Sequence, residues 1–369
     1  MLGSKKLYFY NPMTVVHPQY NELPGIELFA RIFDLLGFNV VVVDRTGHLK
    51  TPVKTKAFSL MPDYRPFTKS YSQICDERAL ELLKKSDQRE LPIYVYYSGG
   101  IDSTLVMSSL LKNATEAQKR RMRVLMSRDS IGENPLFYQN YLMGKLRLEA
   151  SIKFPHLFSK DAMFIGGEYN DQLFGSDIMR DFMNMYGESS ILEKYDRAKM
   201  LKLFEGRWHD MKVVDWYVNL FEDVYSRRPN PTGTHADFFW WLNFSIKWQS
   251  VYFRMLTYAS DFTTKNIDKE FIENNFFHFY GTDDFQLWSM NNPDKKIKNT
   301  WESYKWEAKE TIYEFTKDDW YRKNKIKRGS LSHVIIHQLQ KNFIDEDIRM
   351  YPSLPVEDWY NPDNDFKSF

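Results

Sequence analysis

A run of small and polar residues, SGGIDS (98–103), lies between two apolar stretches and has the residue types needed to bind phosphate. Gly99 and Gly100 lack the Cβ atoms that would keep a phosphate away from backbone N–H groups. Ser98 and Ser103 add hydroxyl donors, and the start of a helix favours negative charge. The turn is not a Walker loop, because no Gly-Lys-Ser/Thr closes it. The spacing therefore predicts a phosphate-binding turn of another kind.

A second stretch whose residues could take part in chemistry is GGEYNDQLFGSD (166–177), which follows a short apolar run. It places two carboxylates, Glu168 and Asp171, just after a predicted strand. Ligands of open α/β sheets bind at the carboxyl ends of the strands, so we expect this stretch and residues 98–103 to meet at that edge. Carboxylates in that place suit a magnesium ion bound to phosphates.

The turn SGGIDS resembles the pyrophosphate-binding loop of the ATP pyrophosphatases, which include asparagine, β-lactam, GMP and NAD synthetases and the enzymes of tRNA thiolation and lysidine formation. Members of this superfamily split ATP between its α- and β-phosphates to adenylate a substrate. The resemblance implies ATP and Mg²⁺ as cofactors. It assigns the binding of pyrophosphate to Ser98, Gly99, Gly100, Asp102 and Ser103.

The second stretch narrows the resemblance to asparagine synthetases and their relatives, whose corresponding segment reads SGEGADELFGGY. The residues that match in register include Gly167, Glu168, Asp171, Phe174 and Gly175. The match implies a catalytic role for Glu168 near the amine or the adenylate, and it adds Gly167 to the nucleotide-binding residues. It also implies that Asp171 contacts Mg²⁺ together with Asp102. The departures, which bear on the substrate more than on the ATP chemistry, are Tyr169, Asn170, Gln172, Ser176 and Asp177.

A basic segment near the end of the chain, WYRKNKIKRGS (320–330), resembles a third part of the family. There a lysine before a glycine reaches back to the ATP phosphates and stabilises the charge that develops at the α-phosphate. Lys327, two residues before Gly329, fits this role best, and Lys325 is the alternative. A solvated basic face or a nucleic-acid patch would have a similar composition.

Parallel strands must position these residues. β-branched and aromatic side chains over 93–97 predict a central strand, with neighbours over 121–127 and 162–165. In the family, the end of the second strand holds adenine through main-chain contacts. The resemblance therefore makes Ser127 or Met126 a candidate for that contact.

Helices are predicted before and after the central strand, the first from about Tyr71 to Lys85. The stretch 135–150 also reads as helical, and the very apolar stretch 238–260 reads as a core helix. Near the N-terminus, an apolar face over 26–36 predicts a helix, and residues 38–44 predict a buried strand.

These elements together predict an α/β fold with three parts. A parallel-sheet ATP pyrophosphatase core (PP-loop core) is expected over 71–185, after a small N-terminal α/β unit over 1–70. A largely helical, aromatic-rich lobe is expected over 186–369, with the basic phosphate-contacting segment 320–330 inside it.

Composition narrows the classes of partner. The chain has 369 residues and a net charge of +1, so it lacks the general electrostatic footprint of a nucleic-acid-binding protein. Its single cysteine, Cys75, excludes an intramolecular disulfide and a multi-cysteine metal site. The N-terminus lacks the apolar core of a signal peptide, and no apolar run approaches the about 20 residues of a membrane span. We therefore expect a soluble, cytoplasmic protein without a membrane partner.

The resemblance implies ATP-dependent formation of an amide. A small-molecule carboxylate attacks ATP at the α-phosphate, pyrophosphate leaves, and an amine or ammonia captures the acyl-adenylate. Glutamine-dependent asparagine synthetases begin with a nucleophilic cysteine, whereas this chain begins Met1-Leu2, so we expect the nitrogen from free ammonia, an amine-bearing metabolite or a partner.

Two other hypotheses stay open from the sequence. One is an enzyme of the same superfamily that modifies a nucleic-acid base. The balanced charge disfavours it, whereas the basic segment 322–328 and the many aromatic residues, which could stack on bases, support it. The other is a non-catalytic nucleotide-binding protein, which the departures in the second stretch allow. The sequence predicts neither the identity of the acid and amine nor the oligomeric state.

Overall fold

The centre of the computed structural model, which describes residues 5–36, 41–229, 233–258, 264–327 and 343–366, is a five-stranded parallel sheet. The strands, in spatial order, are β4 (Arg147–Ala150), β3 (Met122–Met126), β2 (Ile93–Tyr96), β5 (Met163–Gly166) and β6 (Phe276–His278). All side chains of β5 and most of those of β3 are buried, as expected where both faces of a parallel sheet are covered. The predicted α/β class with a parallel sheet is confirmed.

The strand order creates a switch point in the middle of the sheet. β2 comes first in the chain and lies at the centre, β3 and β4 are added on one side, and β5 and β6 are added on the other. The segments that leave β2 and β5 therefore start side by side at the carboxyl edge. Ligands of open α/β sheets bind at this point of the topology.

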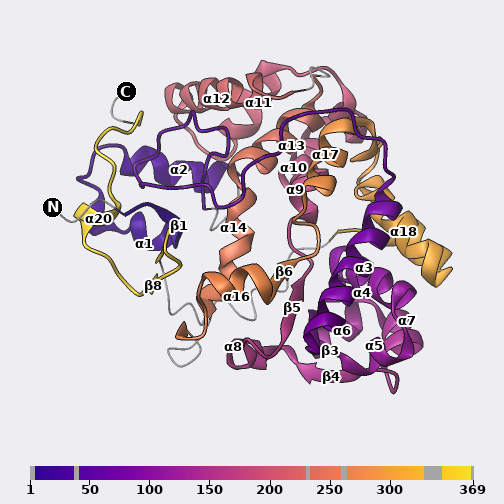
Figure 1. Cartoon of the computed structure of the whole chain (residues 1–369). Coiled ribbons are helices and arrows are strands. Elements are labelled where there is room, and N and C mark those ends of the chain that lie inside the picture. The colour runs from indigo at the N-terminus through magenta and orange to yellow at the C-terminus, as the bar shows by residue number, and fades with distance from the viewer. Residues whose placement is uncertain (1–4, 37–40, 230–232, 259–263, 328–342, 367–369) are drawn as a thin grey trace.

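Three long helices pack together beside the sheet: α3 (Tyr71–Arg89), α4 (Ile101–Asn113) and α18 (Trp306–Thr316) (Figure 1). Shorter helices complete the surroundings of the sheet. They are α5 (Glu116–Arg121), α6 (Arg128–Glu133), α7 (Pro135–Phe137), the π-helical turn η2 (Tyr138–Leu142), the 3-10 turn η3 (Ser151–Lys153), α8 (Phe154–Leu157), α9 (Asn170–Phe174) and α10 (Ile178–Tyr186).

The second half of the chain is mainly helical and has an aromatic core. Its elements are η4 (Glu188–Leu192), α11 (Arg197–Glu205), α12 (Met211–Ser226), α13 (His235–Ile246), α14 (Trp248–Tyr252), η5 (Phe253–Tyr258), α16 (Lys269–Asn274), α17 (Asp283–Asn291), η6 (Pro293–Lys295), η7 (Trp301–Ser303) and α19 (Asp319–Asn324). Every residue of α13 is buried, including Trp240 and Trp241. The core helix predicted over 238–260 is therefore real but divided among α13, α14 and η5.

The two ends of the chain share a small antiparallel sheet. β1 (Leu7–Tyr10) pairs with β7 (Phe343–Asp345), which pairs with β8 (Met350–Tyr351). Figure 1 shows the indigo N-terminal and yellow C-terminal segments together on one side of the molecule, with α1 (Pro12–Val15), η1 (Pro18–Tyr20), α2 (Ile26–Leu36) and α20 (Val356–Trp359). Two of the three strands in this small sheet therefore come from the end of the chain.

Two predicted elements differ in the structure. The stretch 135–150 is not one helix, because its end forms β4, an edge strand whose side chains are mostly exposed and so lack a buried alternation. The strand predicted over 38–44 is wrong for its described residues 41–44, which form no strand. Val43 instead donates from its backbone N–H to the carbonyl of Ile246, 3.0 Å away at the end of α13.

Among the helices that the structure describes, none combines the length and the apolar character that crossing a membrane requires.

Candidate functional site at the carboxyl edge of the parallel sheet

The turn after β2 is shaped by a glycine in the left-handed region. Gly99 has a φ of +76°, and a Cβ there would meet the carbonyl oxygen of Ser130 and lie 2.8 Å from the Cβ of Glu133. The Ser98 N–H donates to Ser103 Oγ at 3.1 Å, and the hydroxyls of these two serines are also 3.1 Å apart. The turn is therefore pinned to the first helical turn of α4.

The N-terminus of α4 has no side-chain cap. Its N-cap residue is Gly100, which has no side chain to accept from the first N–H groups of the helix. Those groups have no acceptor within the helix itself, and they carry the positive end of the helix dipole. The predicted phosphate-binding residues thus surround a helix end that is suited to an anion.

The segment after β5 lies directly against this helix end. A Cβ on Gly167 would lie 3.3 Å from the carbonyl carbon of Asp102 and 3.3 Å from the nitrogen of Ser103. Glycine at this position allows the two backbones to approach closely. This approach brings Asp102, in the first turn of α4, near Asp171, in the first turn of α9.

Both of these carboxylates bind the same ammonium group, that of Lys305. Its Nζ lies 2.7 Å and 2.8 Å from the two carboxylate oxygens of Asp102 and 2.6 Å from Oδ1 of Asp171. The Lys305 side chain is 0% exposed, whereas the carboxylates are 27% and 32% exposed. The carboxylates are therefore reachable from solvent, while the cation lies behind them.

Lys327, the residue predicted to contact the ATP phosphates, adds a second positive charge to the site. Its Nζ lies 3.0 Å from Oδ2 of Asp171 and also pairs with Asp177. Lys325 is directed elsewhere: its Nζ lies 2.5 Å from a carboxylate oxygen of Glu133. The structure thus brings Lys327 to the site and not Lys325; the end of the basic segment, from 328 to 330, lies outside the described residues.

The charges make the two carboxylates unequal. Burial opposes ionisation of Asp171, but Lys305 and Lys327 outweigh it and hold the pKa of Asp171 well below its usual range. Burial raises the pKa of Asp102, with Lys305 acting in the opposite direction and Asp171 adding to the rise. Burial would lower the pKa of Lys327, but Asp171 and Asp177 raise it. Asp171 is therefore the firmly ionised member of the pair.

Glu168 faces a different cation. Its Oε1 accepts from Nη2 of Arg254 at 2.8 Å, and both side chains are 28% exposed. The next residue, Tyr169, has a φ of +82° and stacks on Trp248 with a ring separation of 4.1 Å. Such a backbone is strained for a residue other than glycine, and the stacked ring holds it in place.

Ser127 caps a helix at the end of β3. It is the N-cap of α6, where its Oγ accepts from the Ser130 N–H at 3.4 Å. It lies at the carboxyl edge with its hydroxyl engaged within the turn, and the main-chain contact with adenine stays a prediction.

Several residues of the site were not predicted. Lys305 and Arg254 come from the helical half of the chain, and no motif surrounds them. Asn170 departs from the family pattern, and its side chain donates to Oδ1 of Asp102 at 2.6 Å. Tyr280 donates from its hydroxyl to the carbonyl of Asp102 at 2.8 Å. The polar side chain of Asn170, where the family has a small residue, is the sequence signal that could have indicated a hydrogen bond to the Asp102 carboxylate.

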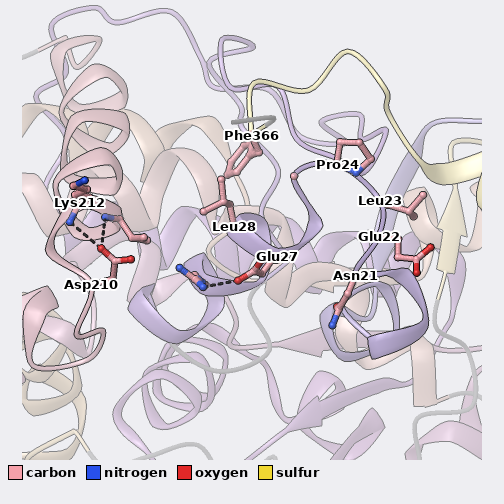
Figure 2. Close-up of a pocket in the computed structure, with 12 residues that line it drawn as sticks. Asn21, Glu22, Leu23, Pro24, Glu27, Leu28, Asp210, Lys212 and Phe366 are labelled. Carbon is pink, nitrogen blue, oxygen red and sulfur yellow. Dashed lines mark hydrogen bonds and ion pairs between the residues drawn. The ribbon is translucent and has the colours of Figure 1, made fainter. Parts of the chain in front are cut away.

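A separate pocket of about 470 Å³ lies between the N-terminal segment and the start of α12 (Figure 2). Two of its charged side chains bond within its own walls: Arg31 pairs with Glu27 at 2.5 Å, and Asp210 accepts from the backbone N–H of Lys212 at 3.1 Å. None of the residues at the sheet edge lines it. The pocket is therefore separate from the candidate site.

Neither the comparison with protein-family models nor the comparison with curated proteins finds a match for this chain.

Proposed function

We propose that the chain is an ATP-dependent ligase of the ATP pyrophosphatase superfamily, similar to the synthetase part of asparagine synthetase. The observation that carries the proposal is the meeting of an uncapped helix N-terminus with Asp102 and Asp171 at the switch point of a parallel sheet. A helix end binds an anion, and paired carboxylates suit the cation that accompanies a phosphate chain.

The phosphate side of the site is made by α4 and two lysines. The first N–H groups of α4, with Ser98 and Ser103, provide donors for the pyrophosphate that leaves ATP. Lys327 and Lys305 supply positive charge beside it. Fixed charges of this kind stabilise a leaving group most when they are already in position before the reaction.

The residues present fit Mg²⁺. In the described part of the chain, no three His, Cys, Asp or Glu side chains gather into an all-protein metal cage. Magnesium in nucleotide sites is commonly held by one or two carboxylates together with phosphate oxygens, and Asp102 and Asp171 already share one cation, the Lys305 ammonium. When bound, Mg²⁺ would neutralise charge on the phosphates of the leaving group.

The proposed reaction has two steps. A carboxylate oxygen of the acid attacks the α-phosphorus, the bond to the β-phosphate oxygen breaks, and pyrophosphate leaves the acyl-adenylate. The nitrogen of an amine or ammonia then bonds to the acyl carbon, and the bond from that carbon to AMP breaks. Glu168 accepts the proton that the nitrogen loses, with Arg254 holding its carboxylate in place.

The test is to incubate the full chain with ATP, Mg²⁺ and a panel of small carboxylic acids and amines, and to identify the nucleotide products. AMP and pyrophosphate that depend on one acid would support the proposal. ADP and phosphate, or no cleavage with any acid, would refute it. Asp102→Asn keeps the size of the side chain and should abolish the release of pyrophosphate, while Asp129→Asn, an exposed carboxylate of α6, is the matched control.

A further inference from the structure

Lys305 lies where the proposed function needs a metal ion. Its ammonium contacts three carboxylate oxygens, two on Asp102 and one on Asp171, at 2.6 to 2.8 Å. Lys327, by comparison, contacts Asp171 and Asp177 and has no recorded contact with Asp102. Lys305 is thus the cation that joins the two carboxylates among the described residues.

The backbone of Lys305 is held in an unusual conformation for this contact. Its φ is +59°, in the left-handed region, and it precedes α18 as the N-cap residue. Its N–H donates to the carbonyl of Lys296 at 3.2 Å. A side chain other than glycine adopts this region at a cost of about 1 kcal/mol or more, so the surroundings must hold it there. The surrounding structure therefore holds Lys305 in a strained backbone conformation at the position from which its ammonium contacts the carboxylates.

An ammonium and a divalent ion cannot both occupy the space between the carboxylates. The Lys305 side chain is fully buried, so its ammonium can leave them only if another anion receives it. A lysine has a flexible four-carbon chain and can follow such an anion over a short distance. Phosphate oxygens at the N-terminus of α4 would be within the same site and would meet this need.

We propose that Lys305 occupies the metal position in the nucleotide-free protein and gives it up only when phosphates arrive to bind its ammonium. This inference rests on the proposed function for the identity of the phosphates. It makes the binding of metal and nucleotide interdependent, because the metal ion alone must compete with a buried ammonium. The chain would then bind free divalent ions weakly although it has two adjacent carboxylates.

The test measures Mn²⁺ binding to the nucleotide-free full chain by electron paramagnetic resonance, with no ATP present. Lys305→Met should bind Mn²⁺ about tenfold or more tightly than the wild type, because the competing charge is gone. Lys327→Met is the matched control, since it removes one positive charge from Asp171 without freeing Asp102, and it should gain less than about threefold. Asp102→Asn, added to Lys305→Met, should cancel the gain.

Equal gains in Lys305→Met and Lys327→Met would overturn the proposal, because they would show a general effect of net charge. An unchanged affinity in Lys305→Met would overturn it as well. If Lys305→Met loses the native circular dichroism spectrum, Lys305→Gln keeps a donor for one carboxylate and takes its place, with the same expected direction. Failure of the wild type to release pyrophosphate would refute the ligase proposal and leave this metal-binding result standing, so the two failures can be told apart.

Discussion

Replacing Lys296 with methionine should stabilise the chain near neutral pH. The Lys296 side chain is fully buried behind the site, and its carbonyl anchors the backbone of Lys305. Its ammonium lies 3.6 Å from the centre of the Trp240 ring, and its Nζ has no hydrogen-bond partner among the described residues. Burial lowers the pKa of Lys296 from 10.5 to about 7, although Asp237 and Asp294 act in the opposite direction.

The size of the effect follows from the difference between these pKa values. At about 1.4 kcal/mol for each pH unit, a fall from 10.5 to about 7 means that burying the charged lysine costs ~5 kcal/mol of stability. Methionine fills a similar volume without a charge, so Lys296→Met should gain up to ~5 kcal/mol at or below pH 7.

The sign of the pH dependence follows from proton binding. Between pH 7 and 10.5 the unfolded chain holds a proton on Lys296 that the folded chain has released, so the stability of the wild type rises with pH over this window. The advantage of Lys296→Met should therefore shrink toward zero as the pH approaches 10.5.

Urea unfolding followed by circular dichroism, repeated at several pH values from about 7 to about 10, measures this advantage. Lys295→Met is the control, because Lys295 is an exposed neighbour and its loss should produce no gain that depends on pH. A variant at 296 that is no more stable than the wild type at pH 7, or whose gain is constant with pH, would refute the reasoning. The site should keep its nucleotide affinity in this variant, because Lys305 hydrogen-bonds to the backbone carbonyl of residue 296, which the substitution retains.

Three further outcomes are expected at the site itself. Gly99→Ala should lower the free energy of unfolding by about 2–4 kcal/mol, because its Cβ would meet the Ser130 carbonyl. Gly47→Ala is the control: Gly47 has a similar φ but open space around it, so the loss should be only about 1 kcal/mol. Urea unfolding measures both losses. Lys327→Met should weaken the binding of MgATP by about 10- to 100-fold in calorimetry, the cost of one charge-assisted hydrogen bond, and an unchanged affinity would remove Lys327 from the site. Assayed with an acid that supports ATP cleavage, Glu168→Gln should slow amide formation by about 10²- to 10⁴-fold and still release pyrophosphate. Equal loss of both activities would contradict the role of Glu168 as the base.

The parts of the site that the sequence predicted are those built from consecutive residues. The strand, turn and helix around SGGIDS are encoded by a local change from β-branched and aromatic residues to glycines and then to an apolar helix. The same holds for β3 and β5. Because parallel strands align their carboxyl ends, the proximity of Asp102 and Asp171 also followed from two local patterns.

The lysine between these carboxylates could not be predicted in this way. Lys305 reaches Asp102 across 203 residues of chain, and its neighbours in sequence form no recognisable pattern. Its positive φ gave no signal either, because glycine is the residue that normally marks such a turn. Arg254 is a similar case: it lies in a short 3-10 helix, and only the packing of the helical half brings it to Glu168.

Two other errors have local causes. The sequence predicts a helix where β4 forms, because β4 lies at the edge of the sheet with exposed side chains and lacks the apolar alternation of a half-buried strand. The apolar composition of the run 38–44 predicts a strand, and the described Val41, Val42 and Val43 are buried. Their backbone groups bond to α13, to a side-chain hydroxyl of α14 and to the Tyr10 hydroxyl, and not to the backbone of another strand. A buried segment without strand pairing and a buried strand both have the β-branched, apolar composition of this run, so composition alone does not distinguish them.

The claim that this site adenylates a carboxylate is tested most directly by following oxygen atoms. An acid that supports ATP cleavage is labelled with ¹⁸O in both carboxylate oxygens, and the products are analysed by mass spectrometry. Attack of the carboxylate on the α-phosphorus predicts one ¹⁸O atom in AMP and one in the amide. AMP without ¹⁸O, or ¹⁸O found in inorganic phosphate, would contradict the account.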